Sequence, residues 1–313
     1  LNPTFDGIVG IVRGVGRARR GGSVSRVRMS LLCAAALAAG LLSPAIASAS
    51  NVSSSAPSSV MAAKASKKKK PKLPPPTGGF DYQLSRAYTP PAGVKIVARD
   101  STDKPLKGAY NICYVNGFQT QPGELKSWPK KLLLTKNGKL FRDPGWPDEV
   151  LLNTSTKAKR KAIAKKLKPA IKRCKTRGFQ AVEFDNLDSW TRSSGKLKKK
   201  HNVAMAKLLV KTAHGYGLAA AQKNTAELGK AGKKTIKFDF AVTEQCIRYR
   251  ECSAYTKVYG RSRVFDIEYA GDLDLTWAQA CARTDRPTRV ILRDRDLTTP
   301  ASEDYVFDSC PMK

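Results

Sequence analysis

The 313-residue sequence has little of the material from which metal and phosphate sites are built. Only two histidines are present and no cysteines are paired as Cys-x-x-Cys, which argues against a zinc site. No glycine-rich phosphate fingerprint occurs, which disfavours a dinucleotide-binding fold. Acidic side chains are scarce too, with 25 Asp and Glu against 57 Lys and Arg. We therefore expect a strongly basic protein that uses neither a metal nor an organic cofactor.

Apolar runs of membrane-spanning length are also missing. The run Leu31–Leu42 is shorter than the ~20 residues that a spanning helix requires. It follows a basic segment, Arg19–Arg28, and precedes small residues at Ala45–Ala49, which is the order of an export signal. Residues 1–49 are therefore predicted to be a signal peptide region whose cleavage gives a secreted, extracellular protein with no further membrane association. A membrane anchor is the alternative.

Residues 50–78 consist largely of Ser, Ala, Pro and Lys and contain almost no apolar surface to bury. Ordering such a segment gains little against its entropy cost, so we predict a disordered linker. The remaining residues 79–313 are of a suitable length for one domain of barrel or doubly wound size.

The predicted domain is itself basic, because residues 79–313 carry 45 of the basic and 24 of the acidic side chains, a formal charge of +21. Many of the lysines fall on a predicted amphipathic helix, which favours a solvated outer face with electrostatic association to an anionic cell wall. Basic residues interleaved with aromatics on one face, the pattern of nucleic-acid binding, are not found, so no nucleic-acid partner is expected. We expect a monomer.

Six cysteines remain once Cys33 is removed with the signal peptide. An even number in an exported chain predicts disulfides. Cys246 and Cys252 are close enough in sequence to form a local loop, and we predict that they are bonded to each other. The sequence alone does not show how Cys113, Cys174, Cys281 and Cys310 are paired.

Eight short apolar runs rich in strand formers alternate with helical patterns along the domain. The clearest helices are predicted over residues 156–176 and 197–215, with Gly178 as a stop signal, and shorter ones follow Asn224 and Asp274. Residues 149–153 are read as an extra short strand. This alternation predicts an α/β fold of the (β/α)8 barrel type, with an open doubly wound sheet as the alternative. The eight predicted strands cover residues 80–84, 94–99, 109–115, 181–184, 218–222, 238–243, 264–268 and 290–292.

Polar and charged residues stand at the ends of these predicted strands. Asp185 follows the fourth run and Glu244 follows the sixth, so a barrel brings both to the rim where active sites form. Glycoside cleavage needs such a pair, because one carboxylate attacks the anomeric carbon or activates water while the other protonates the departing oxygen. The two histidines fall in one predicted helix and are read as surface or packing residues.

Six short blocks follow one another between about residue 80 and residue 270. They are Asp81-Tyr82-Gln83-Leu84, Ile112-Cys113-Tyr114-Val115-Asn116, Gly178-Phe179 with Val182-Glu183-Phe184-Asp185-Asn186-Leu187-Asp188, Gln222-Lys223-Asn224, Glu244-Gln245-Cys246 with Tyr249, Glu251 and Cys252, and Glu268-Tyr269. In these blocks and their order the sequence resembles a known family, glycoside hydrolase family 114, the endo-α-1,4-polygalactosaminidases.

The resemblance implies a barrel enzyme that hydrolyses a galactosamine-containing polysaccharide with an Asp after strand four and a Glu after strand six, which match Asp185 and Glu244. A non-catalytic carbohydrate- or cell-wall-binding protein on the same fold is the alternative. We expect Asp185 to be the nucleophile and Glu244 the general acid/base of a retaining mechanism. The residues expected to bind substrate are Asp81, Tyr82, Asp100, Tyr114, Asn116, Glu183, Asn186, Asp188, Lys223, Asn224, Glu268 and Tyr269.

Overall fold

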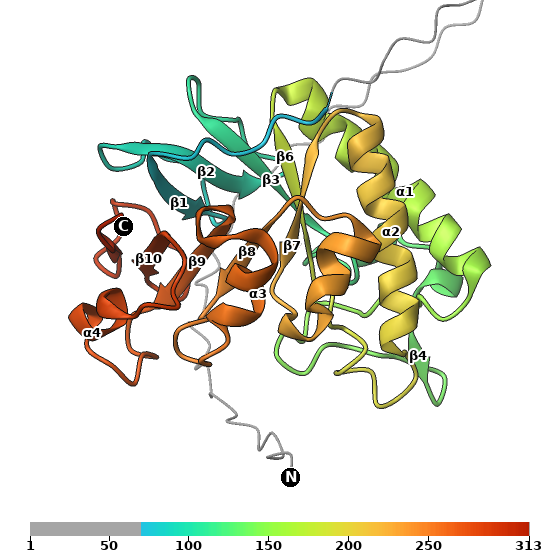
Figure 1. Cartoon of the computed structure of the whole chain (residues 1–313). Helices are drawn as coiled ribbons and strands as arrows, with labels where there is room; N and C mark the ends of the chain where they lie inside the picture. Colours follow the sequence, from blue (N-terminus) through green and yellow to red (C-terminus); the bar gives the residue numbers. More distant parts are fainter. Residues whose placement is uncertain (1–69, 313) are drawn as a thin grey trace, which may run out of the picture. The chain divides into compact units, whose positions relative to one another are not determined.

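The computed structural model describes residues 70–312, and the predicted signal peptide region and residues 50–69 lie outside them. Eight parallel strands in sequence order form one continuous sheet (Figure 1), as the eight apolar runs predict. A ninth strand, β11 (Phe307–Ser309), pairs antiparallel with the last of them. The eight parallel strands are β1 (Gly79–Gln83), β2 (Val94–Asp100), β3 (Tyr110–Asn116), β6 (Ala181–Asp185), β7 (Ala219–Lys223), β8 (Phe240–Glu244), β9 (Val264–Tyr269) and β10 (Arg289–Arg293).

The sheet curves into a nearly closed barrel, with β1 and β10 at the seam. Two buried arginines of β10 bridge this seam instead of a strand ladder. Arg289 donates to the carbonyl of Gly78 at 2.7 Å, and Arg293 contacts the Asp81 carboxylate at 3.1 Å. The fold is therefore of the predicted (β/α)8 type, with the last joint made by side chains.

Side-chain alternation along the strands creates two apolar layers. Ala181, Ala219 and Phe240 belong to the cluster inside the barrel, whereas Val182 and Ala220 belong to the cluster between strands and helices. Because the period is two, the side chains four residues after Ala181, Ala219 and Phe240 also point inward. Those positions are the last residues of β6, β7 and β8.

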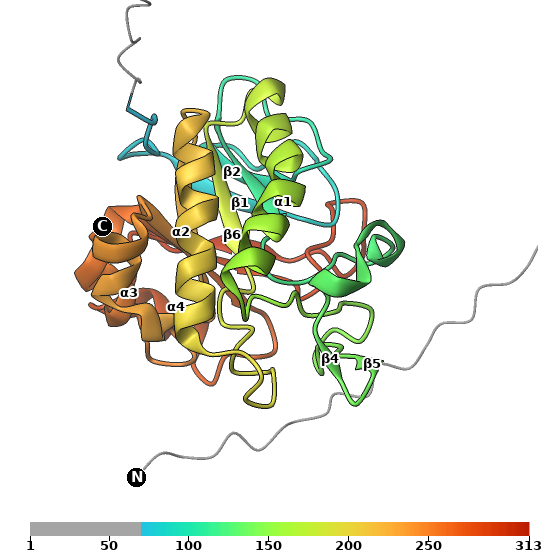
Figure 2. The ribbon, with the colours of Figure 1, turned by 90° about the vertical axis from the view of Figure 1, so that its right-hand side faces the viewer.

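Two long helices cover one side of the barrel and lie side by side (Figure 2). Helix α1 (Lys157–Arg177) begins at Thr156, whose side chain accepts from the Lys159 amide, and ends at Gly178 with a left-handed φ of 102°. Helix α2 (Lys199–Gly215) follows β6. Both agree with the predicted ranges to within about two residues.

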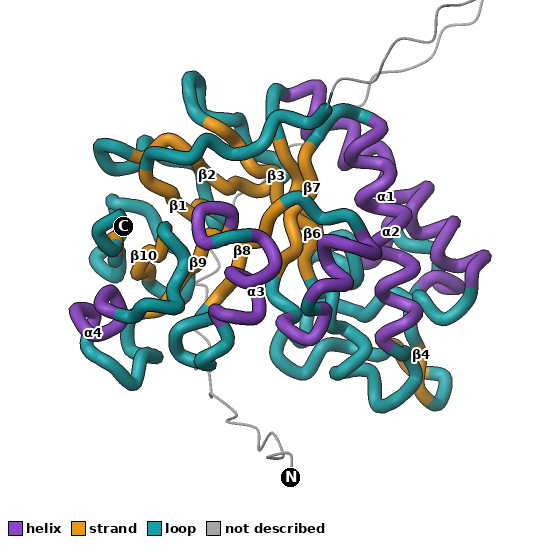
Figure 3. The backbone as a smooth tube through the Cα atoms, in the orientation of Figure 1, coloured by secondary structure: helices purple, strands orange, loops and turns teal. Residues whose placement is uncertain are grey.

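Helices are fewer elsewhere. The segment after β7 holds a 3-10 turn (Ala226–Leu228) and a π-helical turn (Gly232–Ile236), and short helices α3 (Cys252–Tyr259) and α4 (Trp277–Ala282) follow β8 and β9. The described connections from β1 to β2 and from β2 to β3 are loops, which Figure 3 shows in teal. Strand–helix alternation is therefore incomplete in the first quarter of the barrel.

The long excursion between β3 and α1 holds a small hairpin, β4 (Thr135–Lys136) with β5 (Lys139–Leu140). The strand predicted over residues 149–153 is not formed. Residues 150–152 make three isolated bridges to different partners, Arg142, Gln119 and Leu133. The apolar run Val150–Leu152 is buried as a strand would be, but it pairs with surrounding loops and not with one neighbouring strand.

Residues 70–78, the described part of the predicted linker, are packed against the amino ends of the strands. The hydroxyl of Tyr110 donates to the carbonyl of Lys72 at 2.7 Å, and Arg289 donates to the carbonyl of Pro75 at 3.1 Å. Pro74 is buried. Disorder is therefore the wrong expectation for this stretch, because backbone carbonyls can be ordered by donors from the barrel even where a segment has few apolar side chains of its own.

Three disulfides join the six cysteines of the domain. The predicted Cys246–Cys252 bond is confirmed, and it closes the loop that follows β8. The other two bonds are Cys113–Cys174, between β3 and α1, and Cys281–Cys310, between α4 and the end of the described chain. Among residues 70–312, no helix combines the length and the apolar character needed to cross a bilayer.

Candidate active site

Three neighbouring strands end in a charged side chain that points into the mouth of the barrel. They are β6 with Asp185, β7 with Lys223 and β8 with Glu244. The residue after each has a positive φ: 61° at Asn186, 47° at Asn224 and 61° at Gln245. Left-handed backbone in non-glycine residues is uncommon and concentrates at functional sites. The three strands therefore leave the sheet by the same kind of sharp turn, directly after the charged residue.

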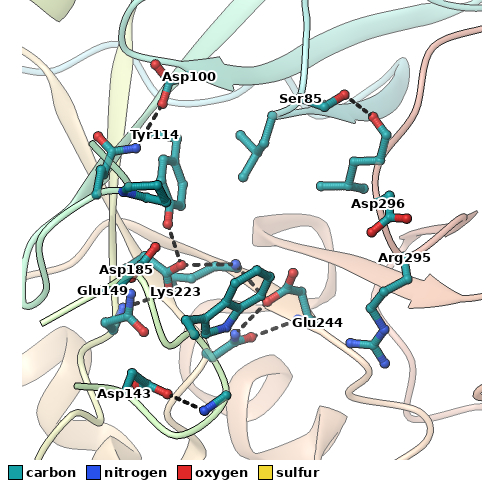
Figure 4. A pocket seen from close by; sticks show the side chains of 18 of the residues that line it. Ser85, Asp100, Tyr114, Asp143, Glu149, Asp185, Lys223, Glu244, Arg295 and Asp296 are labelled. Carbon is teal, nitrogen blue, oxygen red and sulfur yellow. Dashed lines mark hydrogen bonds and ion pairs between the residues drawn. The ribbon is translucent and has the colours of Figure 1, made fainter. Parts of the chain in front are cut away.

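Lys223 lies between the two carboxylates. Its Nζ is 2.8 Å from Glu244 Oε2 and 3.8 Å from Asp185 Oδ2 (Figure 4). The two carboxylate oxygens can therefore be no farther apart than the sum of these distances. Burial alone lowers the pKa of Lys223, but the carboxylates of Asp185, Glu244 and Glu183 reverse this and raise it above the usual value. The ammonium stays charged at every physiological pH.

Glu244 is held by three side chains. Besides Lys223, Asn224 Nδ2 donates to Oε2 at 3.0 Å, and the Tyr269 hydroxyl donates to Oε1. Burial raises the pKa of this carboxyl, but the Lys223 ammonium and the three hydrogen bonds outweigh burial and lower the pKa to about 2. In the free protein Glu244 is therefore ionised.

Asp185 is fixed by two donors. The Tyr114 hydroxyl donates to Oδ2 at 2.8 Å, and the backbone N–H of Asn186 donates to Oδ1 at 2.7 Å. Tyr114 is half-buried, and desolvation together with the Asp185 charge raises its phenol pKa well above the usual value, so it remains a donor. A short side chain with both oxygens held in this way presents one carboxylate edge in a defined direction.

A further carboxyl, Glu183, lies in the barrel interior below the pocket. Tyr82 donates to its Oε1 at 3.0 Å, while Oε2 is buried without a partner among the described residues. Burial raises the pKa of Glu183 to about 8, with Asp185 adding to the effect and Lys223 opposing it. Glu183 is thus protonated near neutral pH, which explains how a carboxyl is accommodated in an apolar interior.

The pocket above these groups has a volume of about 720 Å³. Nine of the predicted site residues line it, from six different strand ends or the loops after them. They are Asp100, Tyr114, Asp185, Asn186, Asp188, Lys223, Asn224, Glu244 and Tyr269.

Five predicted site residues lie elsewhere, and alternation explains the two clearest cases. Asp81 is on the opposite face of β1 from the interior residue Tyr82, and it pairs with Arg293 at the seam. Glu268 is on the opposite face of β9 from the interior residue Tyr269, and its Oε1 accepts from the Ile247 amide at 2.7 Å. Both are structural groups outside the pocket.

The other three support the pocket without lining it. Tyr82 and Glu183 lie in the interior beneath it, as described above. Asn116 is buried, and its Oδ1 accepts from the Gln119 amide at 3.0 Å while its Nδ2 donates to Glu149 at 3.0 Å. Asn116 therefore fixes the start of the excursion after β3.

Sequence reasoning missed several residues that line the pocket from loops. They belong to the excursion after β3 or to the loops after β6 and β10, where no strand or helix period points to them. The most prominent are Asp143, Trp146, Glu149, Arg192, Arg295 and Asp296.

One group in the described chain has the spacing of metal ligands, namely Cys246, Cys252 and Asp266. The two cysteines form a disulfide, so they have no thiolate to offer a metal. Asp266 Oδ1 accepts from the Thr243 hydroxyl at 2.6 Å and from the Cys246 amide at 3.2 Å. The cluster is an anchor for the loop after β8.

Two carboxylates that face one another across a single ammonium, at the rim of a barrel and in a polar pocket, are suited to cleavage of a glycosidic bond. Such a reaction needs one group that attacks or activates water and a second group that donates a proton.

A family model and several solved structures are similar to the chain. The model of glycoside-hydrolase family GH114 matches residues 61–313. The fold is similar to the crystal structure of Aspergillus fumigatus Ega3 in complex with galactosamine, with a TM-score of 0.61 and 19% identity over 77% of this chain and 98% of that chain. It is also similar to the glycoside hydrolase domain of PelA from Pseudomonas aeruginosa, with a TM-score of 0.49 and 11% identity over 75% of this chain and 99% of that one.

No curated protein sequence matches the chain. The likeness to Ega3 is below 25% identity and shows the fold alone, and nothing is based on the weaker likeness to PelA, whereas the family model spans most of the sequence. The chain belongs to glycoside-hydrolase family GH114 and is a glycoside hydrolase.

Proposed function

We propose that this glycoside hydrolase is exported and cleaves internal α-1,4 linkages of a galactosamine-containing polysaccharide. The observation that carries the proposal is the approach of Asp185 and Glu244 to one ammonium, that of Lys223, at the mouth of the barrel. The type of polymer and the internal cleavage rest on membership of the family. Export is supported by the three disulfides, which persist in oxidising compartments.

The charge of the pocket suits an amino sugar. Seven carboxyl side chains line it against three basic ones, although residues 79–313 as a whole carry a formal charge of +21. At ~0.15 M salt, charges more than ~8 Å away are largely screened, so a cationic chain inside the pocket feels the acidic lining more than the basic surface. Repulsion by the basic domain is therefore no obstacle to a cationic polymer.

In the proposed retaining mechanism, an Asp185 oxygen attacks the anomeric carbon while Glu244 transfers its proton to the departing oxygen. Water then attacks the glycosyl ester and Glu244 takes back a proton. The contacts of Asp185 Oδ2 and Glu244 Oε2 with the same ammonium are compatible with the retaining separation of ~5–5.5 Å between carboxyl groups.

The proposed roles require that the protonation state of Glu244 changes when substrate binds. Glu244 must carry a proton in the complex, whereas Lys223 holds its pKa at about 2 in the free protein. Substrate binding must therefore draw Lys223 away from Glu244, and Asp185 already offers the ammonium a second partner at 3.8 Å. The opposite assignment, with Glu244 as nucleophile, is favoured by its ionised state in the free protein.

Aryl glycosides separate the two assignments. A leaving group that needs no proton bypasses the general acid, so Glu244→Gln should retain hydrolysis of such a substrate and respond to added azide if Glu244 is the acid/base. Asp185→Asn should be inactive on the same substrate and unresponsive to azide. The reverse pattern would exchange the two roles and leave the pair itself intact.

A panel of polysaccharides, with released oligosaccharides identified by mass spectrometry, tests substrate and cleavage mode together. We expect a ladder of short oligomers from a galactosamine polymer. Failure to release product from any galactosamine-containing polymer would refute the proposal.

The outer face of α1 and α2 supports a further proposed partner, an anionic cell wall. Eleven of the 21 residues of α1 are Lys or Arg and none is acidic. None of these side chains forms an ion pair within the described residues. Adsorption to purified wall should be strong at low salt and should fall steeply as ionic strength rises.

A further inference from the structure

The excursion after β3 brings a carboxylate to the pocket that the proposed reaction does not use. Glu149 lines the pocket on the same side as Asp185 (Figure 4) and is only 9% exposed. One of its oxygens, Oε2, accepts from Asn116 Nδ2 at 3.0 Å. The other, Oε1, has no hydrogen-bond partner in the described chain and opens onto the pocket. A nearly buried acceptor with a vacant oxygen facing a ligand site calls for a donor from the ligand.

The charged groups around Glu149 do not satisfy it. Asp143 and Asp185 are the acidic neighbours, and Arg192 is the basic one. Arg192, however, is occupied by Asp143 at 2.6 Å and Asp188 at 2.7 Å, and it also donates to Asn186. Tyr114, the remaining titratable neighbour, directs its hydroxyl to Asp185. The positive charge that would complete this wall of the pocket is therefore missing from the described residues.

Trp146 stands in the same turn. The Glu149 amide donates to the Trp146 carbonyl at 2.9 Å, so the two residues are the first and last of one tight turn. The Trp146 side chain lines the pocket and is 64% exposed, the largest value among the large apolar side chains of the described residues. An exposed indole beside a vacant carboxylate offers a flat apolar surface and a charged acceptor to one ligand.

We propose that Glu149 is a specificity-determining residue that accepts a hydrogen bond from the ammonium group of an amino sugar while Trp146 stacks on the sugar ring. This inference rests on the proposed function and names the substituent that the pocket selects, a free amine in preference to an N-acetyl group. A charge-assisted bond to Glu149 satisfies its vacant oxygen. An N-acetyl group brings no charge to this wall and therefore gains nothing from the carboxylate.

The selectivity depends on pH in a defined direction. Burial, with repulsion from Asp185 and Asp143, raises the pKa of Glu149 to about 7 against the opposing effects of Asn116 and Arg192. The ammonium binds the ionised form, so affinity for a free amine rises as the pH rises through about 7, until the amine itself loses its proton. Affinity for an N-acetylated sugar lacks this dependence.

The test compares kcat and KM on matched galactosamine oligosaccharides with free and with fully N-acetylated amines. Glu149→Gln keeps the shape and the bond to Asn116 but removes the charge. Its KM for the free-amine substrate should rise about ten- to a hundredfold, as expected for a hydrogen bond to a charged group, with kcat nearly unchanged. KM for the acetylated substrate should hardly move, and the dependence of KM on pH near 7 should disappear.

Two further variants act as controls. Trp146→Ala should raise KM for both substrates by a similar factor, because the indole stacks on the sugar ring whether the amine is free or acetylated. Asp304→Asn removes the same charge from an exposed position that does not line the pocket, and it should change neither KM. Equal effects of Glu149→Gln on both substrates, or no effect on either, would overturn the inference, and thermal melting confirms that the variant is folded.

A binding measurement separates this inference from the proposed function. Calorimetry with the same two oligosaccharides on Asp185→Asn, with and without Glu149→Gln, needs no turnover. A preference for the free amine that vanishes with Glu149→Gln supports the inference even if the native enzyme cleaves neither polymer, an outcome that would refute the proposed function alone. Absence of any preference, or of any binding, overturns the assignment of Glu149.

Discussion

The two ends of the barrel use charged side chains in opposite ways. At the amino ends of the strands, Arg289 donates to the carbonyls of Gly78, Pro75 and Ser262, and each guanidinium nitrogen has a backbone partner. At the carboxyl ends, Asp185, Lys223 and Glu244 face an open pocket. Arg289 at the amino end helps to close the barrel, whereas these three groups at the carboxyl end remain available to a ligand.

The difference predicts where substitutions act. Changes at the carboxyl end should alter turnover with little effect on folding, because that end of a barrel carries the active site. Changes at the amino end should alter the free energy of unfolding with little effect on chemistry, which is the usual division in barrels of this type. A residue that violates this division would show that the two ends are coupled.

The largest expected effect is at the catalytic pair. Asp185→Asn and Glu244→Gln should each lower kcat on the polysaccharide by about a thousandfold or more, because each removes a nucleophile or an acid/base group while keeping its shape. Melting temperatures should stay within a few degrees of the native value. A folded variant with substantial activity would show that the substituted carboxylate is not catalytic.

The next effect tests the amino end. Arg289→Met keeps an apolar chain of similar length but leaves three carbonyls without their donor, at a cost of about 1–3 kcal/mol for each that stays buried. We expect the free energy of unfolding in urea to fall by about 3 kcal/mol and kcat of the folded protein to be unchanged.

Arg86→Met is the matched control, since Arg86 is exposed and the change should cost less than ~0.5 kcal/mol. A chain that starts at Gly78 lacks the segment that Arg289 and Tyr110 hold, so it should also be destabilised. Loss of kcat without loss of stability in either variant would contradict the separation of the two ends.

Much of this arrangement follows from the sequence because strands have a period of two. The eight apolar runs locate the strands, and the inward residues Ala181, Ala219 and Phe240 predict that the strand-end charges face the pocket. The same rule would have excluded Asp81 and Glu268, whose neighbours Tyr82 and Tyr269 point inward. The expectation for Asp81 rests on a family block and that for Glu268 on a strand end, and neither takes the face of the strand into account.

Other parts of the site could not be predicted from periodicity. Glu149 and Trp146 lie in the irregular excursion after β3, where the backbone forms only isolated bridges. The sequence there has no helix or strand period that would show which side chains point toward the pocket. The order of residues 70–78 depends on donors such as Arg289 that are distant in sequence. In both places the deciding contacts are between side chains and irregular backbone.

The third prediction concerns Glu183, which lies between the two ends. The unfolded carboxyl loses its proton near its usual pKa of 4.5, whereas burial keeps the folded one protonated up to a pKa of about 8. The folded protein therefore binds one more proton between these two values, and stability falls as the pH rises through that window. Glu183→Gln keeps the bond from Tyr82 and removes the titration.

Urea unfolding of the native protein and of Glu183→Gln at pH 5, 6.5 and 8 measures this effect. We expect a gap of a few kcal/mol to open in favour of the variant as the pH rises. Parallel curves for the two proteins would mean that Glu183 is ionised in the interior and paired with Lys223, and the pocket floor would then carry a charge.

The smallest effect on activity is expected at the α1–α2 face, which lies outside both ends of the barrel. Lys161, Lys165, Lys168 and Lys211 line a groove there, and like charges three or four residues apart destabilise a helix. Lys165→Glu with Lys211→Glu should therefore raise stability slightly while weakening adsorption to anionic wall at low salt. The matched control, Lys95→Glu with Lys257→Glu, makes the same change in net charge at exposed positions in β2 and α3, outside these two helices. If only the first pair weakens adsorption, the basic face binds the wall locally; if both pairs weaken it equally, net charge alone is responsible and the face has no partner of its own. Turnover of short oligosaccharides should be the same in all three proteins, because the screening length of ~8 Å isolates the pocket from this surface.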